Sequence, residues 1–319
     1  MMIGVNIMNI LEDTMLVYRI AKNYYIDGYG QKEIAKMTGI SRPQISRLIK
    51  RGQEMGIVKI EVSLPETIEV KELEMELASC LGVGSSIIIP SDRTADIDNF
   101  FPLAAGRVEE CLQGHHYIGI GWGHSLYEIS RNLSFQENHT ELVFYPLIGC
   151  SGSINPYLQV GSIVDRFAER YRAKARYLNL PVYLRESNIS RDEVGKWQAF
   201  QKRWERLDAA VIGIGTLGMK DPIYIDEVSK DPYLIKWKKD IEGDVLAYMM
   251  LKDGSILHIP GYQHIACPID TLKKIPSVIA VAKGVNKAEA IYRAAANKYF
   301  STLITDENTA KEIIRLSSK

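Results

Sequence analysis

The stretch QKEIAKMTGISRPQISRLIK (residues 31–50) decides how the N-terminal part of this chain folds. A small residue, Ala35, is followed by Gly39 and then by a second apolar set that includes Ile45 and Leu48. Two short helices that cross at a tight corner need this order, because Ala35 lets them approach closely and Gly39 turns the chain. The pattern predicts a helix-turn-helix.

The residues around this corner predict where its helices begin and end. Ser41 and Gln44 form a capping-box signature, in which each side chain serves a backbone group of the other, and Pro43 fits the first turn of the helix that follows. The turn sequence DGYG ends an earlier helix whose apolar residues recur at helical spacing. The predicted helices cover about 13–26, 31–37 and 42–53.

The distribution of charge favours DNA as the partner of this segment. Residues 13–63 contain nine lysines and arginines against five acids, whereas the whole chain has a net charge of zero. The rest of the chain is therefore mildly acidic. A basic module joined to an acidic body is typical of a DNA-reading domain attached to a second domain.

The outward face of the third predicted helix is polar and basic. We expect Gln44 and Arg47 to read base edges in the major groove, because an amide and a guanidinium can each form paired hydrogen bonds with them. The other basic or hydroxyl side chains suit phosphate contacts. The alternative is a solvated basic face on a small helical bundle. The predicted DNA-binding residues are Arg42, Gln44, Ser46, Arg47, Lys50 and Arg51.

Length and composition bound the rest of the interpretation. A chain of 319 residues favours two domains, and we place them at 1–65 and 66–319. Alternating apolar and polar residues over 57–64 predict a strand pair or wing, which makes the first domain a (winged) helix-turn-helix. No apolar run approaches the ~20 residues of a membrane span, so we expect a cytoplasmic protein that does not contact a membrane.

The four cysteines are far apart and include no Cys-x-x-Cys pair. Neither a zinc knuckle nor a disulfide framework is indicated, and we expect no metal and no cofactor.

The larger domain alternates short apolar runs with amphipathic helices. This order is typical of parallel strands with crossover helices, so it predicts a Rossmann-like layered α/β domain. Ligands of such sheets bind beyond the carboxyl ends of the strands. The predicted strands lie near 85–90, 116–121, 141–148, 175–180, 208–214, 245–250, 277–282 and 301–305, and the predicted helices near 70–82, 104–113, 160–172, 190–206, 285–296 and 306–316. Function is expected in the loops GWGHS, GCSGS, GIGTLG and AKGVNK.

The segment IGIGWGHSLYEIS (118–130) is the most informative of these loops. A strand ends in glycines and opens directly into a helix at Ser125, an arrangement that brings backbone N–H groups close to an anion. Gly121 and Gly123 are the candidate phosphate cradle. The segment fits neither the dinucleotide fingerprint nor the Walker pattern. The alternative is close packing of a strand against a helix, without any ligand.

Several motifs, taken in this order, resemble the SorC/DeoR-type family of bacterial sugar-responsive transcription regulators. They are the N-terminal segment YYIDGYGQKEIAKMTGISRPQISRLIKRGQEMGIVKIEV and then IGIGWGHSL, DAAVIGIGTLG, GDVLAYMMLKDG, VIAVAKGVNKAEAIYRAA and LITDENTA. The resemblance covers nearly all of the chain. It implies an effector and oligomerisation domain with a fold like that of sugar-phosphate isomerases, a phosphorylated sugar as effector, and a homo-oligomer, preferably a tetramer rather than a dimer, on operator DNA.

The resemblance also implies the residues that contact the effector. The phosphate is expected around Gly121 and Gly123, with His124 and Ser125 beside it. The sugar contacts carried over from the family are Gln159, Asp244 and Lys287. The sequence departs from the family at His124, where many relatives have Arg or Lys, and at Lys283–Gly284 in place of two glycines. Each of these residues also has a purely structural alternative, such as capping a turn or a helix.

The main hypothesis is therefore a sugar-phosphate-responsive regulator of a carbohydrate-utilisation operon, which is not an enzyme. The alternative is a sugar-phosphate isomerase or deaminase with an appended helical domain. Asp244 and His258 are the candidate bases for that chemistry, but neither sits in a recognisable catalytic spacing. A scaffold that binds neither DNA nor sugar is disfavoured by the glycine loops.

Overall fold

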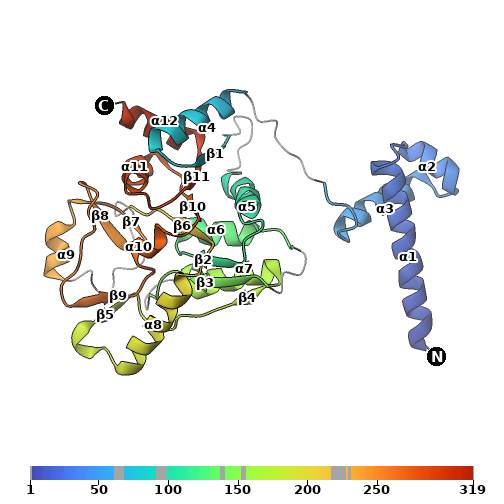
Figure 1. Ribbon diagram of the computed structural model, residues 1–319. Coiled ribbons are helices and arrows are strands. Elements are labelled where there is room, and N and C mark those ends of the chain that lie inside the picture. The colour runs from blue at the N-terminus through green and yellow to red at the C-terminus, as the bar shows by residue number, and fades with distance from the viewer. Residues whose placement is uncertain are drawn as a thin grey trace. The chain divides into compact units, whose positions relative to one another are not determined.

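The computed structural model of the protein divides into two compact units, Met1–Pro65 and Glu66–Lys319 (Figure 1). The structure describes residues 2–60, 68–90, 99–136, 141–151, 156–216, 228 and 231–318, with side chains from residue 14 onward.

The N-terminal unit contains the predicted helix-turn-helix. Its helices are α1 (Met2–Tyr25), α2 (Gln31–Thr38) and α3 (Arg42–Glu54). Gly39 adopts a left-handed φ of 73° at the corner, a conformation that glycine adopts without a steric penalty. A small core closes the unit, and its fully buried members are Ile20, Ile34, Ile45 and Ile49. The inward face read from the sequence is therefore the one that packs.

The start of α1 differs from the prediction, and the predicted wing is described only in part. Helix α1 begins at Met2, so the predicted start near residue 13 was wrong. Residues 2–25 contain no proline, so no residue of this kind breaks the helix before it ends near the turn at Gly28, whose φ is 75°. Of the predicted wing, residues 57–60 form no strand, and residues 61–64 lie outside the described part of the chain.

A seven-stranded parallel sheet forms the centre of the second unit (Figure 1). The strands lie in the order β1-β11-β10-β6-β2-β3-β4, and each pair of neighbours is parallel. Their bounds are β1 Ser85–Ile89, β2 Tyr117–Ile120, β3 Val143–Pro146, β4 Lys174–Ala175, β6 Ala209–Gly213, β10 Ser277–Val281 and β11 Thr302–Asp306. Their central residues are almost all buried, as expected for a sheet that is covered on both faces.

The helices fall into two contacting groups. Helices α4, α11 and α12 contact one another, while α6 contacts both α5 and α7. Crossovers between parallel strands are right-handed. A helix that connects strands in one direction along the sheet therefore covers one face, and a helix that connects them in the other direction covers the opposite face. Their bounds are α4 Ile68–Leu81, α5 Phe100–Cys111, α6 His124–Asn132, α7 Val160–Tyr171, α8 Arg191–Trp204, α9 Pro232–Trp237, α10 Ile269–Leu272, α11 Ala288–Ala296 and α12 Glu307–Ser317, with short 3₁₀ turns η1 Pro156–Leu158, η2 Glu186–Asn188 and η3 Val285–Lys287.

One predicted strand was wrong. The segment 245–250 is not a single strand of the parallel sheet, because the chain reverses within it. Strands β7 (Ile241–Val245) and β8 (Tyr248–Leu251) form an antiparallel hairpin, and Leu246 and Ala247 at its turn have φ of 51° and 59°. The apolar run hid the reversal, since non-glycine residues with positive φ are uncommon. A second antiparallel pair, β5 (Tyr183–Arg185) with β9 (Tyr262–His264), was missed.

The strand order fixes where a ligand site can form. From β2 the chain proceeds outward to β3 and β4, whereas β6, which follows them in sequence, lies on the other side of β2. The connections after β2 and β6 therefore diverge, and a crevice beyond the carboxyl ends of adjacent strands is the usual ligand position in such a sheet. The loops GWGHS and GIGTLG both begin there.

We expect Gly149→Ala to lower the free energy of unfolding by about 1–3 kcal/mol, the usual cost of overpacking. A Cβ at Gly149 would lie 2.6 Å from the carbonyl oxygen of Leu180 and 2.7 Å from that of Pro181, and backbone yields little. The control is Gly195→Ala in α8, where a Cβ meets nothing within 4 Å; it should stabilise the protein by about 0.5–1 kcal/mol. Urea unfolding measures both, and equal effects would contradict the packing argument.

Candidate functional site

The two glycines of the predicted phosphate cradle are required by different constraints. The N–H of Gly121 donates to the carbonyl of Val211 in β6, at 2.8 Å, so the loop after β2 is held against the neighbouring strand. A Cβ at Gly121 would lie 3.2 Å from Leu246 Cδ2 in the β7–β8 turn. Gly123 precedes the first turn of α6 with φ of 102°, a conformation that L residues rarely adopt. Only Gly123, where a Cβ would meet nothing within 4 Å, leaves open space for an anion to approach the backbone, whereas the constraint at Gly121 is the close packing given above as the alternative.

His124 and Ser125 begin helix α6, as predicted. The side chain of His124 is 61% exposed, and its Nε2 lies 3.9 Å from Glu128 Oε1 one turn later. The Glu128 carboxylate would therefore offset the positive charge of a protonated His124. The positive end of the α6 dipole and its first N–H groups are then the more dependable anion-binding elements.

Asp244 and Lys287 converge on the loop after β6, although 43 residues separate them in sequence. The backbone of Asp244 exchanges hydrogen bonds with Gly215, at 3.0 and 3.1 Å. The amine of Lys287 donates to the carbonyl of Ile214 at 3.0 Å. Both side chains are buried, with exposed fractions of 4% and 9%. Burial lowers the pKa of Lys287, and the Asp244 carboxylate opposes this shift.

The β7–β8 turn positions the Asp244 carboxylate. Asp244 Oδ2 accepts a hydrogen bond from the N–H of Ala247 at 3.2 Å, and the Tyr183 hydroxyl donates to the carbonyl of Ala247 at 2.8 Å. The turn is thus held from both sides, which maintains its uncommon positive φ angles. A side chain at Gly215 would collide with Asp244 Oδ1, so the loop after β6 and the carboxylate fit only with glycine there.

The motif LITDENTA fixes the loop that leads to Lys287. The N–H of Gly284 donates to Asp306 Oδ2 at 3.1 Å and to Thr309 Oγ1 at 2.8 Å. Asp306 Oδ1 also accepts from the N–H groups of Asn308 and Thr309 and so caps α12. One carboxylate therefore begins a helix and anchors a neighbouring loop, which gives this motif a physical role that the sequence alone did not show.

Gln159 stands apart from the Asp244–Lys287 pair. It precedes α7, and both ends of its side-chain amide bond Ser151: Oε1 accepts from the Ser151 N–H at 3.2 Å, and Nε2 donates to the Ser151 carbonyl. Ser151 belongs to the predicted loop GCSGS, whose residues 152–153 lie outside the described part of the chain. The amide of Gln159 thus holds this loop in the described structure, and a role in sugar contact stays a prediction.

All six predicted DNA-binding residues are exposed on α3. The structure adds a constraint on Gln44, because its Oε1 accepts hydrogen bonds from the N–H and the hydroxyl of Ser41, at 3.3 and 2.8 Å. The capping interaction uses the oxygen that a paired contact with adenine needs, so such a contact requires the cap to open. Arg47 is therefore the better candidate of the two predicted base readers. Lys50, a predicted phosphate contact, lies 3.8 Å from the carboxylate of Glu54.

Sequence reasoning missed residues that complete the site. Ile214 supplies the carbonyl that holds Lys287, and the Thr216 hydroxyl is enclosed without a hydrogen-bond partner within the described residues. The motif GIGTLG had named this loop, but not which atoms it uses. Within the described ranges, no group of three or more His, Cys, Asp or Glu side chains is arranged to hold a metal ion. None of the described helices is long and apolar enough to cross a membrane.

The lowered pKa of Lys287 predicts a pH-dependent stability. The folded protein binds this proton more weakly than the unfolded chain, whose lysine has the ordinary pKa of 10.5. As pH rises from the lowered pKa toward 10.5, only the unfolded chain still holds the proton, so stability rises. We expect the free energy of unfolding of the wild type to increase relative to Lys287→Met over this range. Urea unfolding at several pH values measures it.

Lys283→Met, in the same loop but only partly buried, is the matched control and should parallel the wild type. A wild-type advantage that stays constant with pH would contradict the burial of a charged Lys287.

Comparisons with known proteins agree with this architecture. A family model described as "Putative sugar-binding domain" matches residues 66–315. The sorbitol operon regulator of Klebsiella pneumoniae is 26% identical over 317 residues, which cover 95% of this chain and 99% of that protein. The transcriptional regulator LsrR of Escherichia coli (strain K12) is 28% identical over 311 residues, 94% of each chain.

Two solved structures share the fold. The full-length sorbitol operon regulator SorC from Klebsiella pneumoniae matches with a TM-score of 0.77 at 24% identity, over 95% of this chain and 99% of that chain. A transcriptional regulator from Streptococcus pneumoniae TIGR4 matches with a TM-score of 0.70 at 21% identity, over 79% and 98%. The predicted helix-turn-helix joined to a Rossmann-like domain is confirmed, and the enzyme alternative gains no support. This chain belongs to the SorC/DeoR-type family of transcription regulators that carry a sugar-binding domain.

Proposed function

We propose that this regulator binds operator DNA through α3 and that a phosphorylated sugar, bound beyond the carboxyl ends of β2 and β6, controls its affinity for DNA in the cytoplasm. The observation that carries the proposal is the convergence of Asp244 and Lys287 on the loop after β6, beside the glycine cradle after β2. A carboxylate accepts sugar hydroxyls, an amine and helix N–H groups bind phosphate, and the two strands are neighbours.

Each element of the site has a defined role in this proposal. The backbone around Gly121 and Gly123, with His124 and Ser125, receives the phosphate at the start of α6. Asp244 accepts hydroxyl groups of the sugar, and Lys287 donates to the ligand or holds the Ile214 carbonyl. A bound phosphate would raise the pKa of Lys287 by adding negative charge beside a buried amine.

The effector acts on DNA binding through the arrangement of subunits. A single helix-turn-helix makes few base contacts, so specific binding needs two or more half-sites and therefore a homo-oligomer, for which we favour a tetramer over a dimer. A ligand changes the affinity for DNA only to the extent that it prefers one arrangement, typically by 1–3 kcal/mol. The relative named as a sorbitol operon regulator supports a carbohydrate operon as the target.

We expect Arg47→Ala to weaken binding to the DNA upstream of the protein's own operon by about 1–3 kcal/mol and to reduce its preference over random duplex, because a base contact is lost. Arg191→Ala, which removes the same charge from an exposed position of the other unit, is the control and should leave the preference unchanged. Fluorescence anisotropy at two salt concentrations measures both. Identical discrimination by the two variants would exclude Arg47 as a base-reading residue.

We expect phosphorylated hexoses to raise the melting temperature of the wild type more than the same hexoses without phosphate. Lys287→Met should lose most of this difference, because it removes a buried cation, and His124→Ala should lose only part of it. Both variants should keep their affinity for DNA in the absence of sugar, which shows that they fold. Equal shifts with phosphorylated and plain sugars would remove the assignment of the anion cradle.

A further inference from the structure

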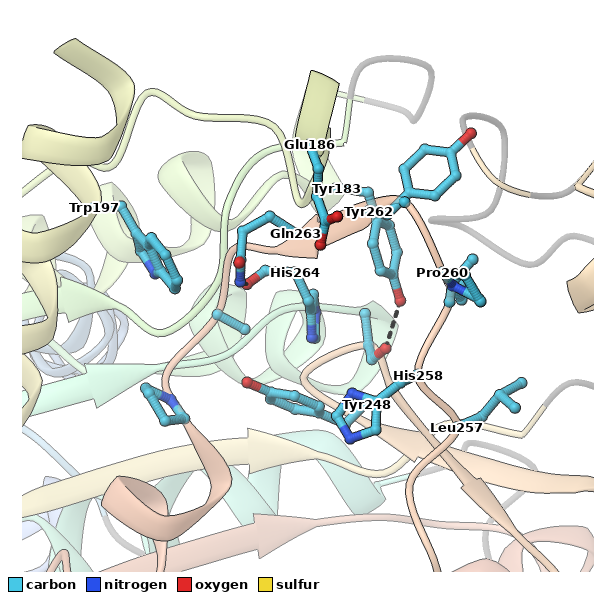
Figure 2. Close-up of a pocket in the computed structure, with 15 residues that line it drawn as sticks. Tyr183, Glu186, Trp197, Tyr248, Leu257, His258, Pro260, Tyr262, Gln263 and His264 are labelled. Carbon is cyan, nitrogen blue, oxygen red and sulfur yellow. Dashed lines mark hydrogen bonds between the residues drawn. The ribbon is translucent and has the colours of Figure 1, made fainter. Parts of the chain in front are cut away.

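A cavity next to the β7–β8 turn has no part in the proposed function. Its volume is about 440 Å³, within the usual range of small-molecule sites. Figure 2 shows its walls, which come from β5, helix α8, strand β8 and the segment that leads through β9. Ala247 and Tyr248 line it, so the cavity adjoins the turn that positions Asp244.

The walls of this cavity are aromatic. His264 stacks on Tyr183, with ring centroids 4.9 Å apart and an interplanar angle of 19°, and it meets Tyr248 edge-on at 4.2 Å. In Figure 2, His264 lies between Trp197 on one side and Tyr183 on the other. Flat aromatic faces with polar edges suit a ligand that has both an apolar face and hydroxyl groups.

Two polar atoms of the wall are enclosed, and within the described residues neither has a hydrogen-bond partner: His264 Nε2 and Trp197 Nε1. Burial lowers the pKa of His264 to about 3, and a hydrogen bond to the backbone of Leu246 opposes this shift. The imidazole is thus neutral. A neutral imidazole has one bare nitrogen and one N–H, so His264 can accept a hydrogen bond at Nε2, whereas the indole N–H is a donor.

An enclosed donor and an enclosed acceptor together select the ligand class. Leaving either unpaired costs about 1–3 kcal/mol. A cation offers nothing to the Trp197 N–H, and an anion cannot donate to His264, while a hydroxyl group does both. No lysine or arginine is among the described residues that line the cavity, and Glu186 contributes a carboxylate at its rim, so a phosphate is disfavoured.

We propose that this cavity is a second ligand site, which takes an uncharged polyhydroxy compound such as a free hexose or hexitol. A ring hydroxyl donates to His264 Nε2, another accepts from Trp197 Nε1, and the apolar face of the ligand packs on the aromatic wall. Glu186 and Gln263 accept or donate to the remaining hydroxyls at the opening. The proposal does not depend on the phosphate site and does not use its residues.

The test is calorimetric titration of the full-length protein with D-glucose, D-mannose, D-fructose and the corresponding hexitols, each also added in the presence of saturating hexose phosphate. At least one of them should bind, and should still bind when the phosphate compound is present. Trp197→Phe and His264→Phe should each weaken this binding roughly fivefold to tenfold, since the first removes the indole N–H and the second removes Nε2 together with Nδ1, while each leaves an aromatic ring at its position.

Trp237→Phe is the matched control, because the Trp237 indole N–H is also enclosed without a partner in the described structure but does not line the cavity. It should bind like the wild type. Absence of binding by every compound at 100 mM overturns the proposal, and so does equal affinity in Trp197→Phe and Trp237→Phe. Binding that is lost in Lys287→Met but kept in Trp197→Phe places the sugar in the phosphate site and overturns it as well. A failure to bind DNA or hexose phosphate affects only the proposed function.

Discussion

The parallel pairing of β2 with β6 is the constraint on which the rest of the second unit depends. It joins two strands that lie 89 residues apart, with Ile118 opposite Ala209. After β2 the chain continues to β3 on one side of this pair, and after β6 it continues to strands on the other side. The loops that follow are brought together by the pairing itself, through the hydrogen bond from Gly121 to Val211. The hairpin and the start of α11 then need only to reach this point for Asp244 and Lys287 to meet.

The buried polar pair at this point is costly unless it is fully bonded. Asp244 and Lys287 are both almost inaccessible, and taking two charges out of water is offset only by good geometry and further hydrogen bonds. The backbone supplies those bonds, from Ala247 to the carboxylate and from the amine to Ile214. Such an arrangement holds both side chains in place, and in the proposed sugar site this would reduce the cost of ordering them on binding.

Much of this fold was readable from the sequence, because its signals are local. The corner at Gly39, the cap at Ser41 and the alternation of apolar runs with helices gave the helix-turn-helix and nearly every strand of the sheet. The glycines after β2 were named from the glycine-rich turn between a strand and a helix, and Asp244 and Lys287 from the family resemblance. The sequence did not show that Asp244 and Lys287 converge on the loop after β6.

What was missed depends on distant contacts or on unusual backbone conformations. The reversal at Leu246–Ala247 has no glycine to signal it, since the Asp244 carboxylate within the hairpin and the distant Tyr183 hydroxyl hold the turn. The cavity at His264 brings β9 against β5 and α8, which precede it by a long stretch of chain. The occupation of Gln44 and Gln159 by backbone groups is equally invisible in the sequence, because any exposed amide looks available until its neighbours are placed.

The position of β1 at the edge of the sheet has a consequence for synthesis. Its pairing partner is β11, and Ser85 and Thr302, which face each other, are 217 residues apart. On the ribosome, β1 therefore waits for almost the whole chain to emerge, with an unpaired edge that invites aggregation. The buried core of the helix-turn-helix lies between Ile20 and Ile49, and the partly buried Leu16 packs against it. Interrupted translation would thus yield chains in which the helix-turn-helix has its core while the sheet of the second unit still lacks β11.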